Sequence, residues 1–139
     1  MRFARIARQL PARLAAGSFI LNSGIGKWSA DEQTAGGLHG MAVTAYPFLG
    51  QVKPADFARL LSAGEIAVGT ILLLPFVPEA VAGAALTAFS GTLLGLYWRT
   101  DGLHEQGSPR PTQAGIPLAK DAWLLGIGLS LMIDGLTSD

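Results

Sequence analysis

Four stretches of the chain are apolar enough to suggest helices that cross a membrane. The clearest runs from Ala80 to Trp98 without a formal charge, close to the roughly 20 residues that a helix needs to cross a bilayer core. It ends in an aromatic pair followed by Arg99, which is typical of a helix end at the lipid headgroups. Together the four stretches predict an all-α integral membrane four-helix bundle, a single domain of residues 1–139. The spans are expected at Ala12 to Trp28, Pro54 to Val77, Glu79 to Trp98 and Ile116 to Leu136.

The two middle spans are predicted to form an antiparallel hairpin. From Leu60 to Val77 the chain is apolar except for Glu65, and Pro54 stands where a first helical turn accepts a proline. Only a few residues separate this stretch from the next, and such short connections join antiparallel neighbours. A Gly91-x-x-x-Gly95 pair in the second helix could let a second copy pack closely, so a homo-oligomer is one expectation.

The first span is short on its own. Its uncharged stretch from Leu14 to Gly26 covers about 20 Å at about 1.5 Å per residue. Arg13 and Lys27 flank it, and their aliphatic stems could carry the charges to the two interfaces and so lengthen the span. A signal peptide is the alternative, because an Arg-bearing start precedes a short apolar stretch, although no clear A-x-A cleavage site follows.

The residues before this span form an amphipathic pattern. On a helical wheel the arginines and the large apolar residues fall on opposite sides: Arg2, Arg5, Arg8 and Arg13 against Phe3, Ile6 and Leu10. This pattern predicts an N-terminal interfacial helix on the membrane surface. Lys and Arg are in excess on the cytoplasmic side of membranes, so the segment favours a cytoplasmic N-terminus. The other basic residues near helix ends fall mainly on the opposite side and do not support the same orientation.

Two connections remain between the spans. Trp28 to Val52 contains a Gly36-Gly37 break and then the apolar run Met41 to Gly50, which is too short to span a bilayer. We expect a short re-entrant or interfacial helix there, covering one end of the bundle. Thr100 to Gly115 holds glycines, prolines and polar residues and predicts a solvated loop.

Composition excludes several functions. Half of the residues are hydrophobic and 14% are charged, ten basic against ten acidic, so the chain has no basic excess for nucleic acid. The absence of cysteine removes disulfides, thiolate metal sites and CxxC redox pairs. His39 and His104 lie in different connections without metal-ligand spacing, so we expect no metal site. Any redox role is therefore expected to be indirect, through a partner.

The candidate site residues are polar groups inside the apolar stretches: Lys27, Glu65, Lys120, Asp121 and Asn22. A carboxylate in an apolar span is costly and usually faces a partner or a water-filled cavity. Glu65 is expected to contact Lys27 or Lys120. Three interpretations stay open, namely an ion pair that fixes the helix register, a proton or ligand site, and a solvent contact at the interface. Lys120 and Asp121 could instead be a charged helix start at the headgroups.

Several short motifs resemble DoxX-like proteins. The Arg-led apolar run Arg13 to Trp28 closes with glycine and a nearby lysine, as the first helix of that family does. Gly64-Glu65-Ile66-Ala67-Val68-Gly69 is similar to the glutamate-bearing start of its second helix, and Lys120-Asp121-Ala122-Trp123-Leu124-Leu125 to the Lys-Asp lead of its last. The motifs follow the family's order over nearly the whole chain. The connection from Asp31 to Val52 is longer and more apolar than the family pattern.

The resemblance implies a multi-pass protein of the bacterial plasma membrane with cytoplasmic termini. DoxX-like proteins are four-helix membrane proteins, some linked to thiosulfate:quinone oxidoreduction and others to complexes that handle oxidative stress. The expected function is therefore an accessory or scaffold subunit beside a membrane-associated redox protein. No cofactor is predicted, although a quinone could bind near Ser18, Asn22 or Lys27. The alternatives are a small-molecule carrier or channel that uses polar residues around Glu65, and an interfacial enzyme that uses Glu65 or Lys27 as acid or base.

Overall fold

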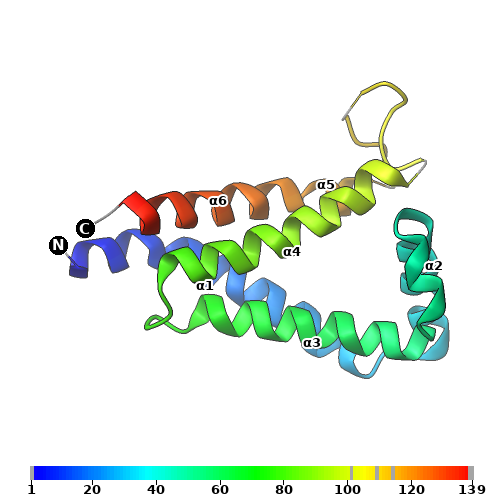
Figure 1. The fold of residues 1–139 in the computed structure, drawn as a ribbon, viewed down its shortest axis with the longest axis horizontal. Coiled ribbons are helices and arrows are strands. Elements are labelled where there is room, and N and C mark those ends of the chain that lie inside the picture. The colour runs from blue at the N-terminus through cyan, green and yellow to red at the C-terminus, as the bar shows by residue number, and fades with distance from the viewer. Residues whose placement is uncertain (1, 101, 109, 114, 138–139) are drawn as a thin grey trace.

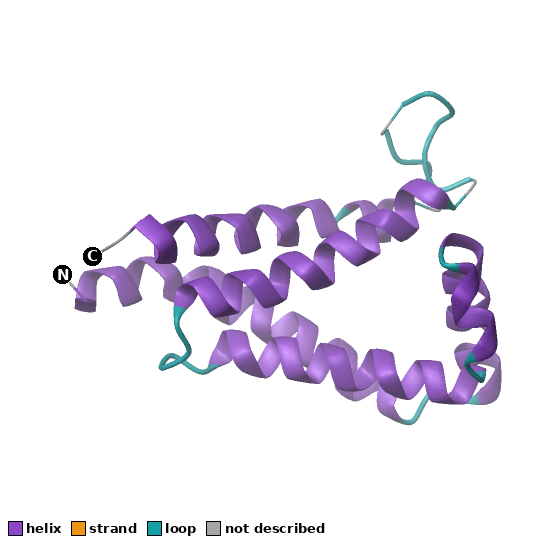
Figure 2. Cartoon of the chain, in the orientation of Figure 1, coloured by secondary structure: helices purple, strands orange, loops and turns teal. Residues whose placement is uncertain are grey.

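The computed structural model describes residues 2–100, 102–108, 110–113 and 115–137, and this part of the chain is all-helical. Figure 2 shows that the connections are short except for the loop between residues 100 and 115. The helices are α1 (Arg2–Trp28), α2 (Glu32–Ala45), the 3-10 helix η1 (Pro47–Gln51), α3 (Pro54–Leu73), α4 (Glu79–Arg99), α5 (Ile116–Ala119) and α6 (Asp121–Thr137).

The four long helices are arranged as two pairs. α1 packs along α3, and α4 packs along α6, whereas contacts between the pairs are fewer. Figure 1 shows the pairs close together near the start of α1 and the end of α6, and diverging toward the opposite end, where α2 lies across them. A small buried core joins the pairs where they meet: Ala16, Ile20, Leu72, Ala82, Leu86 and Leu131.

Glycines set the close approach of α1 to α3. A Cβ on Gly17 would lie 3.1 Å from the carbonyl oxygen of Gly69, and a Cβ on Gly69 would lie 2.7 Å from the backbone nitrogen of Leu21. Further along the same contact, toward the end of α1, the Ser62 hydroxyl donates to the carbonyl oxygen of Gly24 at 2.6 Å. The two backbones therefore touch without intervening side chains, as small residues allow in tightly packed membrane helices.

The α4–α6 pair uses the same device. A Cβ on Gly83 would lie 2.6 Å from the carbonyl oxygen of Gly128, and one on Gly135 would lie 2.5 Å from the backbone nitrogen of Ala80. A Cβ on Gly128 would in turn meet the Thr87 hydroxyl at 2.6 Å. In both pairs, therefore, glycines stand where the two helix backbones come closest.

The structure corrects three predicted boundaries. The expected interfacial segment is not separate, because α1 runs as one helix from Arg2 to Trp28 with Pro11 inside it. α3 ends at Leu73 rather than Val77, since Pro75 follows and a residue before proline disfavours helix. The last predicted span is divided at Lys120 into α5 and α6.

The connection after α1 forms the end cover that the sequence predicted, with different bounds. α2 begins at Glu32 rather than Met41, and its first turn is capped by Asp31, whose side chain accepts from the Thr34 backbone N–H at 2.8 Å. This hydrogen bond lowers the pKa of the exposed Asp31 carboxyl. The helix continues through Gly36 and Gly37, so the predicted break there is wrong: the cap and the helical neighbours outweigh the cost of two glycines.

α2 is held against the start of α3 and the last turns of α4. The Tyr46 hydroxyl donates to the carbonyl oxygen of Thr92 at 2.8 Å, and Arg99 donates to the carbonyl oxygen of Ala45 at 3.3 Å. The Arg99 guanidinium also lies over the Tyr46 ring, 5.2 Å from its centre. Arg99, the cation at the end of α4, thus also binds the end of α2.

Among the described residues one helix is both long and apolar enough to cross a membrane, α4, whose most apolar stretch has a mean hydropathy of 1.5 and is 33% buried. α6 has the higher apolar content for its length but only 17 residues. α1 and α3 are long enough and carry several charges.

Candidate functional site

An ion pair joins the last turn of α1 to the middle of α3. The Lys27 ammonium lies 3.0 Å from Glu65 Oε1, with 27% and 6% of the two side chains exposed. The sequence-based expectation that Glu65 contacts Lys27 is met. Lys27 also donates to the Ser23 hydroxyl at 2.5 Å, whereas Glu65 Oε1 accepts no hydrogen bond from the described residues. The contact is therefore an ion pair whose geometry is not that of an aligned hydrogen bond.

The local sequence of α1 explains why Glu65 is buried there. Gly24 stands opposite it, and a Cβ on Gly24 would lie 2.9 Å from the Glu65 Cβ. The missing side chain lets α3 approach α1 so closely that the carboxylate is enclosed by the two helices. Lys27 lies one turn beyond Gly24 on α1, within reach of the carboxylate.

Asp121 adds a second carboxylate from the other helix pair. It opens α6 and is half-buried, and it lies close enough to Glu65 and Lys27 to interact electrostatically with both. Of the predicted site residues, Lys27 and Glu65 are thus in contact, and Asp121 interacts with them through longer-range electrostatics. We call Lys27, Glu65 and Asp121 the charged cluster.

The other two predicted site residues are not part of it. Asn22 is exposed, because it lies on the face of α1 opposite the glycines that contact α3. Lys120 is also exposed, because it stands in the turn between α5 and α6 rather than inside a helix. Asn22 is thus not a buried polar group, and the exposure of Lys120 agrees with the alternative interpretation, a charged helix start. Ser18 is exposed as well, so the polar groups suggested for a quinone are not gathered around Lys27.

A buried arginine that the sequence assigned to the interface lies inside the protein. Arg13 is 5% exposed, and its guanidinium donates to four carbonyl oxygens at the end of α3 and in the turn that follows. The acceptors are Leu72 at 2.8 Å, Leu74 at 2.9 Å, Ile71 at 3.1 Å and Val77 at 3.1 Å. The last carbonyls of a helix have no partner within it, so Arg13 completes the end of α3. The sequence signal for this role was the position of one arginine within an apolar run.

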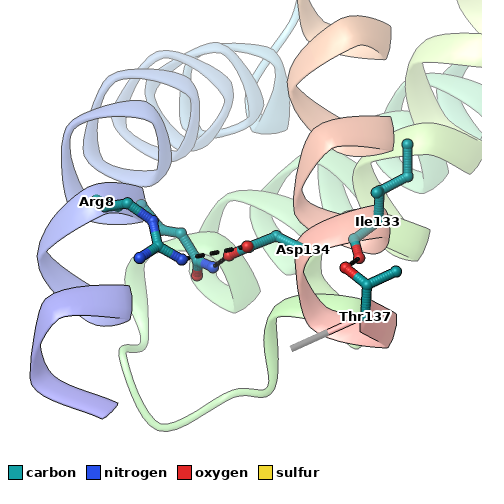
Figure 3. Close-up of polar contacts among 5 residues, drawn as sticks. Arg8, Ile133, Asp134 and Thr137 are labelled. Carbon is teal, nitrogen blue, oxygen red and sulfur yellow. Dashed lines mark hydrogen bonds and ion pairs between the residues drawn. The ribbon is translucent and has the colours of Figure 1, made fainter. Parts of the chain in front are cut away.

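A second polar contact ties α1 to α6 near their outer ends. Arg8 lies 3.3 Å from Asp134, and Gln9 also donates to the Asp134 carboxylate, as Figure 3 shows. A groove of about 530 Å³ runs from there between the two helices. It is lined by Arg8, Gln9, Ala12, Trp123, Gly126, Ile127, Ser130, Leu131 and Asp134.

The two histidines have structural partners. His39 lies 2.8 Å from the carbonyl oxygen of Leu49, and the His104 ring stacks on Trp98 with centres 4.4 Å apart. Within the described ranges, no three His, Cys, Asp or Glu side chains are grouped so that they could hold a metal ion. Of the GxxxG pair, Gly91 is open, whereas Gly95 is covered by the Tyr46 hydroxyl.

No family model matches the chain, and no curated protein or solved structure matches it either.

Proposed function

We propose that this chain is a multi-pass protein of the bacterial plasma membrane that acts as a non-catalytic accessory or scaffold subunit of a membrane redox or oxidative-stress complex. In this proposal α1, α3, α4 and α6 cross the bilayer, with both termini on the cytoplasmic side. α2 lies at the opposite interface. The motifs that resemble DoxX-like proteins support the proposed association with a redox or oxidative-stress complex.

The observation that carries the membrane proposal is the distribution of apolar and charged side chains. Large apolar side chains point outward from all four long helices, where a lipid bilayer would cover them. The most exposed are Phe19, Ile25, Leu60, Trp98, Trp123, Ile133 and Leu136. Two charged side chains within these helices, Arg13 and Glu65, are turned inward, each 5% exposed. A water-soluble helical domain has the reverse arrangement.

The contacts of the inward polar groups support a scaffold role. Arg13 binds the end of α3, and Lys27 pairs with Glu65 across the α1–α3 contact. Asp134 joins α6 to the start of α1. Each of these groups holds helices together, which is the work of a structural subunit.

The test compares membranes from cells with and without the chain. Thiosulfate-dependent reduction of a water-soluble quinone should fall when the chain is deleted and return when it is supplied again. The purified chain in lipid nanodiscs should reduce no quinone and show no haem or flavin absorption. Quinone reduction by the purified chain, or unchanged activity in the deletion, would overturn the accessory role.

A second function is favoured by the charged cluster. Lys27 and Glu65 belong to the α1–α3 pair, and Asp121 begins α6 in the other pair. Ionisable groups buried within a membrane protein often mark the path of a proton or a solute. If the protein is a carrier, these residues are the expected binding site for the transported proton or solute.

A further inference from the structure

We propose that His104 is a proton-binding side chain that holds the loop after α4 closed when its ring is protonated. The loop connects α4 to α5 and extends beyond the end of α4 (Figure 1). The ligand is a proton from water, and its binding forms one N–H bond without any electron transfer. The inference goes beyond the accessory-subunit proposal and does not depend on a redox partner.

Both ring nitrogens of His104 face carbonyl oxygens. Nε2 lies 2.9 Å from the carbonyl oxygen of Trp98. Nδ1 lies 2.9 Å from that of Glu105 and 3.0 Å from that of Ser108. A carbonyl oxygen only accepts hydrogen bonds, and a neutral imidazole has one N–H, so one of its nitrogens would present a lone pair to an acceptor. The imidazolium ion donates from both nitrogens, and the geometry therefore fits the protonated ring.

The ring of Trp98 supplies a second contact that favours the charged form. The His104 and Trp98 rings are nearly parallel, with an angle of 7° between their planes and 4.4 Å between their centres. The face of an aromatic ring is negative, and indole attracts cations more strongly than phenyl or phenol rings do. The stacked position therefore favours the imidazolium ion over the neutral ring.

The end of α4 supplies a third contribution. Trp98 is the penultimate residue of α4, and the last carbonyl groups of a helix have no acceptor role within it. They carry the negative end of the helix dipole, which stabilises a nearby cation such as a protonated histidine. Nε2 of His104 faces one of these carbonyl groups. The bound proton thus gives the end of α4 a hydrogen-bond donor.

The ring joins the loop to the helix. Within the loop, the Glu105 N–H donates to the carbonyl oxygen of Arg110 at 2.9 Å, and the Thr112 N–H donates to that of Leu103 at 3.1 Å. His104 stands inside this folded segment, with Nδ1 toward the loop and Nε2 toward α4. Loss of one ring N–H therefore breaks the connection on one of these two sides.

The titratable and charged groups around His104 come from α4, from the loop and from the turn before α6. On α4 the Tyr97 ring lies 5.7 Å from the His104 ring, and Arg99 is turned toward α2, where it donates to the carbonyl oxygen of Ala45. The other charged side chains in the described part of these segments are exposed: Glu105, Arg110 and Lys120. Water and salt screen exposed charges, whereas the carbonyl and indole contacts of the ring are direct.

Protonation is therefore linked to closure of the loop. In an open loop the ring is in water, where a histidine titrates at about pH 6.5. The closed loop favours the charged form, so the ring there keeps its proton to a higher pH. This stabilisation of the closed loop is fully present below about pH 6.5 and is lost as the pH rises through the midpoint of the closed loop. With cytoplasmic termini the loop faces the outside of the cell, and this location alone rests on the proposed function.

The first experiment is NMR of the ring nitrogens in the full chain, labelled at its two histidines and studied in detergent micelles over a pH series. The nitrogen chemical shifts distinguish an imidazolium ion from a neutral ring. His39→Gln leaves the His104 signal alone in the spectrum. Its midpoint should lie above the ordinary value of about 6.5 by roughly half a unit to one unit. A midpoint at or below about 6.5 would overturn the proposal.

A pair of tryptophan variants tests the stacked contact. Trp98→Leu removes the indole but keeps the backbone carbonyl group, and it should lower the His104 midpoint by about half a unit. Trp123→Leu is the matched control, because Trp123 is an exposed tryptophan on α6, and it should leave the midpoint unchanged. Circular dichroism checks that both variants keep their helices. Equal midpoints in the two variants would overturn the role of the stacked ring.

The second experiment measures closure by hydrogen exchange of the loop amides, corrected for the intrinsic pH dependence of exchange. Protection of the Glu105 and Thr112 amides should fall as the pH rises, by about tenfold for a midpoint one unit above the ordinary value. His104→Gln should abolish this pH dependence, and His39→Gln should keep it. Protection that does not change with pH in the wild-type chain, or that changes equally in His104→Gln, would overturn the proposal. Labelling of Gln106→Cys in intact cells tests the outward location separately.

Discussion

The Arg13 side chain donates from Nε to the carbonyl oxygen of Leu72 at 2.8 Å, and this bond anchors the middle of α1 to the end of α3. Three more carbonyls in the same turn accept from the guanidinium. Arginine suits the position because its planar group presents several donors in a fixed arrangement. The turn between α3 and α4 is thereby built against α1.

Removing this side chain should be strongly destabilising. Arg13→Ala leaves carbonyl groups without partners in a buried turn, and we expect a loss of roughly 2–4 kcal/mol in the free energy of unfolding. Arg13→Lys should rescue little, because one ammonium cannot reach all four acceptors. Thermal unfolding in detergent measures the effect.

The control for this variant is Arg8→Ala on the same helix. The Arg8 side chain is 60% exposed and contacts Asp134, so its loss should cost less than about 1 kcal/mol. Equal melting temperatures for Arg13→Ala and Arg8→Ala would show that the buried hydrogen bonds do not stabilise the fold.

The role of Arg13 marks the limit of what the sequence could predict. The apolar runs predicted four long helices near their observed positions, because hydrophobicity and helix breakers are local properties. A helical wheel could not show that Arg13 faces the end of another helix, since that depends on the crossing of α1 and α3. The same holds for the hydrogen bond from Arg99 to the Ala45 carbonyl oxygen, because a pattern within one helix does not show which other helix its end meets.

The candidate site was predictable in part for a related reason. Glu65 stood out because a carboxylate in an apolar stretch needs a partner, and Lys27 was a cation within reach of a neighbouring helix. In the sequence, Asn22 and Lys120 are polar residues of the same apolar stretches and could not be told apart from Lys27 and Glu65. Their exposure follows from the facing of α1 and from the turn at the start of α6, neither of which is set by residue type.

The glycines at the helix contacts offer a matched comparison within single helices. Gly69→Ala should be destabilising, because its Cβ would lie 2.7 Å from the Leu21 backbone nitrogen and α1 would have to move away. Gly64→Ala on the same helix meets nothing within 4 Å. It should be neutral or stabilising by about 0.5–1 kcal/mol, since alanine favours helix over glycine.

The α4–α6 contact allows the same test with Gly83→Ala and Gly91→Ala. The Cβ on Gly83 would lie 2.6 Å from the carbonyl oxygen of Gly128, whereas that on Gly91 meets nothing within 4 Å. The melting temperatures of Gly69→Ala, Gly64→Ala, Gly83→Ala and Gly91→Ala measure whether glycine is required at the helix contacts. Similar values for the contact and open positions would contradict the close backbone packing.

The Lys27–Glu65 pair predicts an order among variants. Glu65→Gln keeps hydrogen-bonding capacity and should be milder than Glu65→Leu, which leaves the Lys27 ammonium without its counter-charge. Adding Lys27→Met to Glu65→Leu should recover part of the loss, because no unpaired charge then remains. Thermal stability of the singles and the double measures the coupling. Strictly additive losses, or wild-type stability for every variant, would rule out an energetic link between these two side chains.

The arrangement of the helices predicts which segments face the same side of the membrane. The turn after α3 and the end of α6 lie at one end of the molecule, while the α1–α2 connection and the loop after α4 lie at the other (Figure 1). The chain has no cysteine, so single cysteines can report each position.

Phe76→Cys and Thr137→Cys should share one side of the membrane, and Ser29→Cys and Gln106→Cys should share the other. With cytoplasmic termini, a membrane-impermeant thiol reagent should label only the second pair in intact cells and the first pair after permeabilisation. Labelling of all four variants in intact cells would mean that the helices do not cross the bilayer. Labelling of both Phe76→Cys and Ser29→Cys in intact cells, without the other two, would mean that α3 does not cross the bilayer.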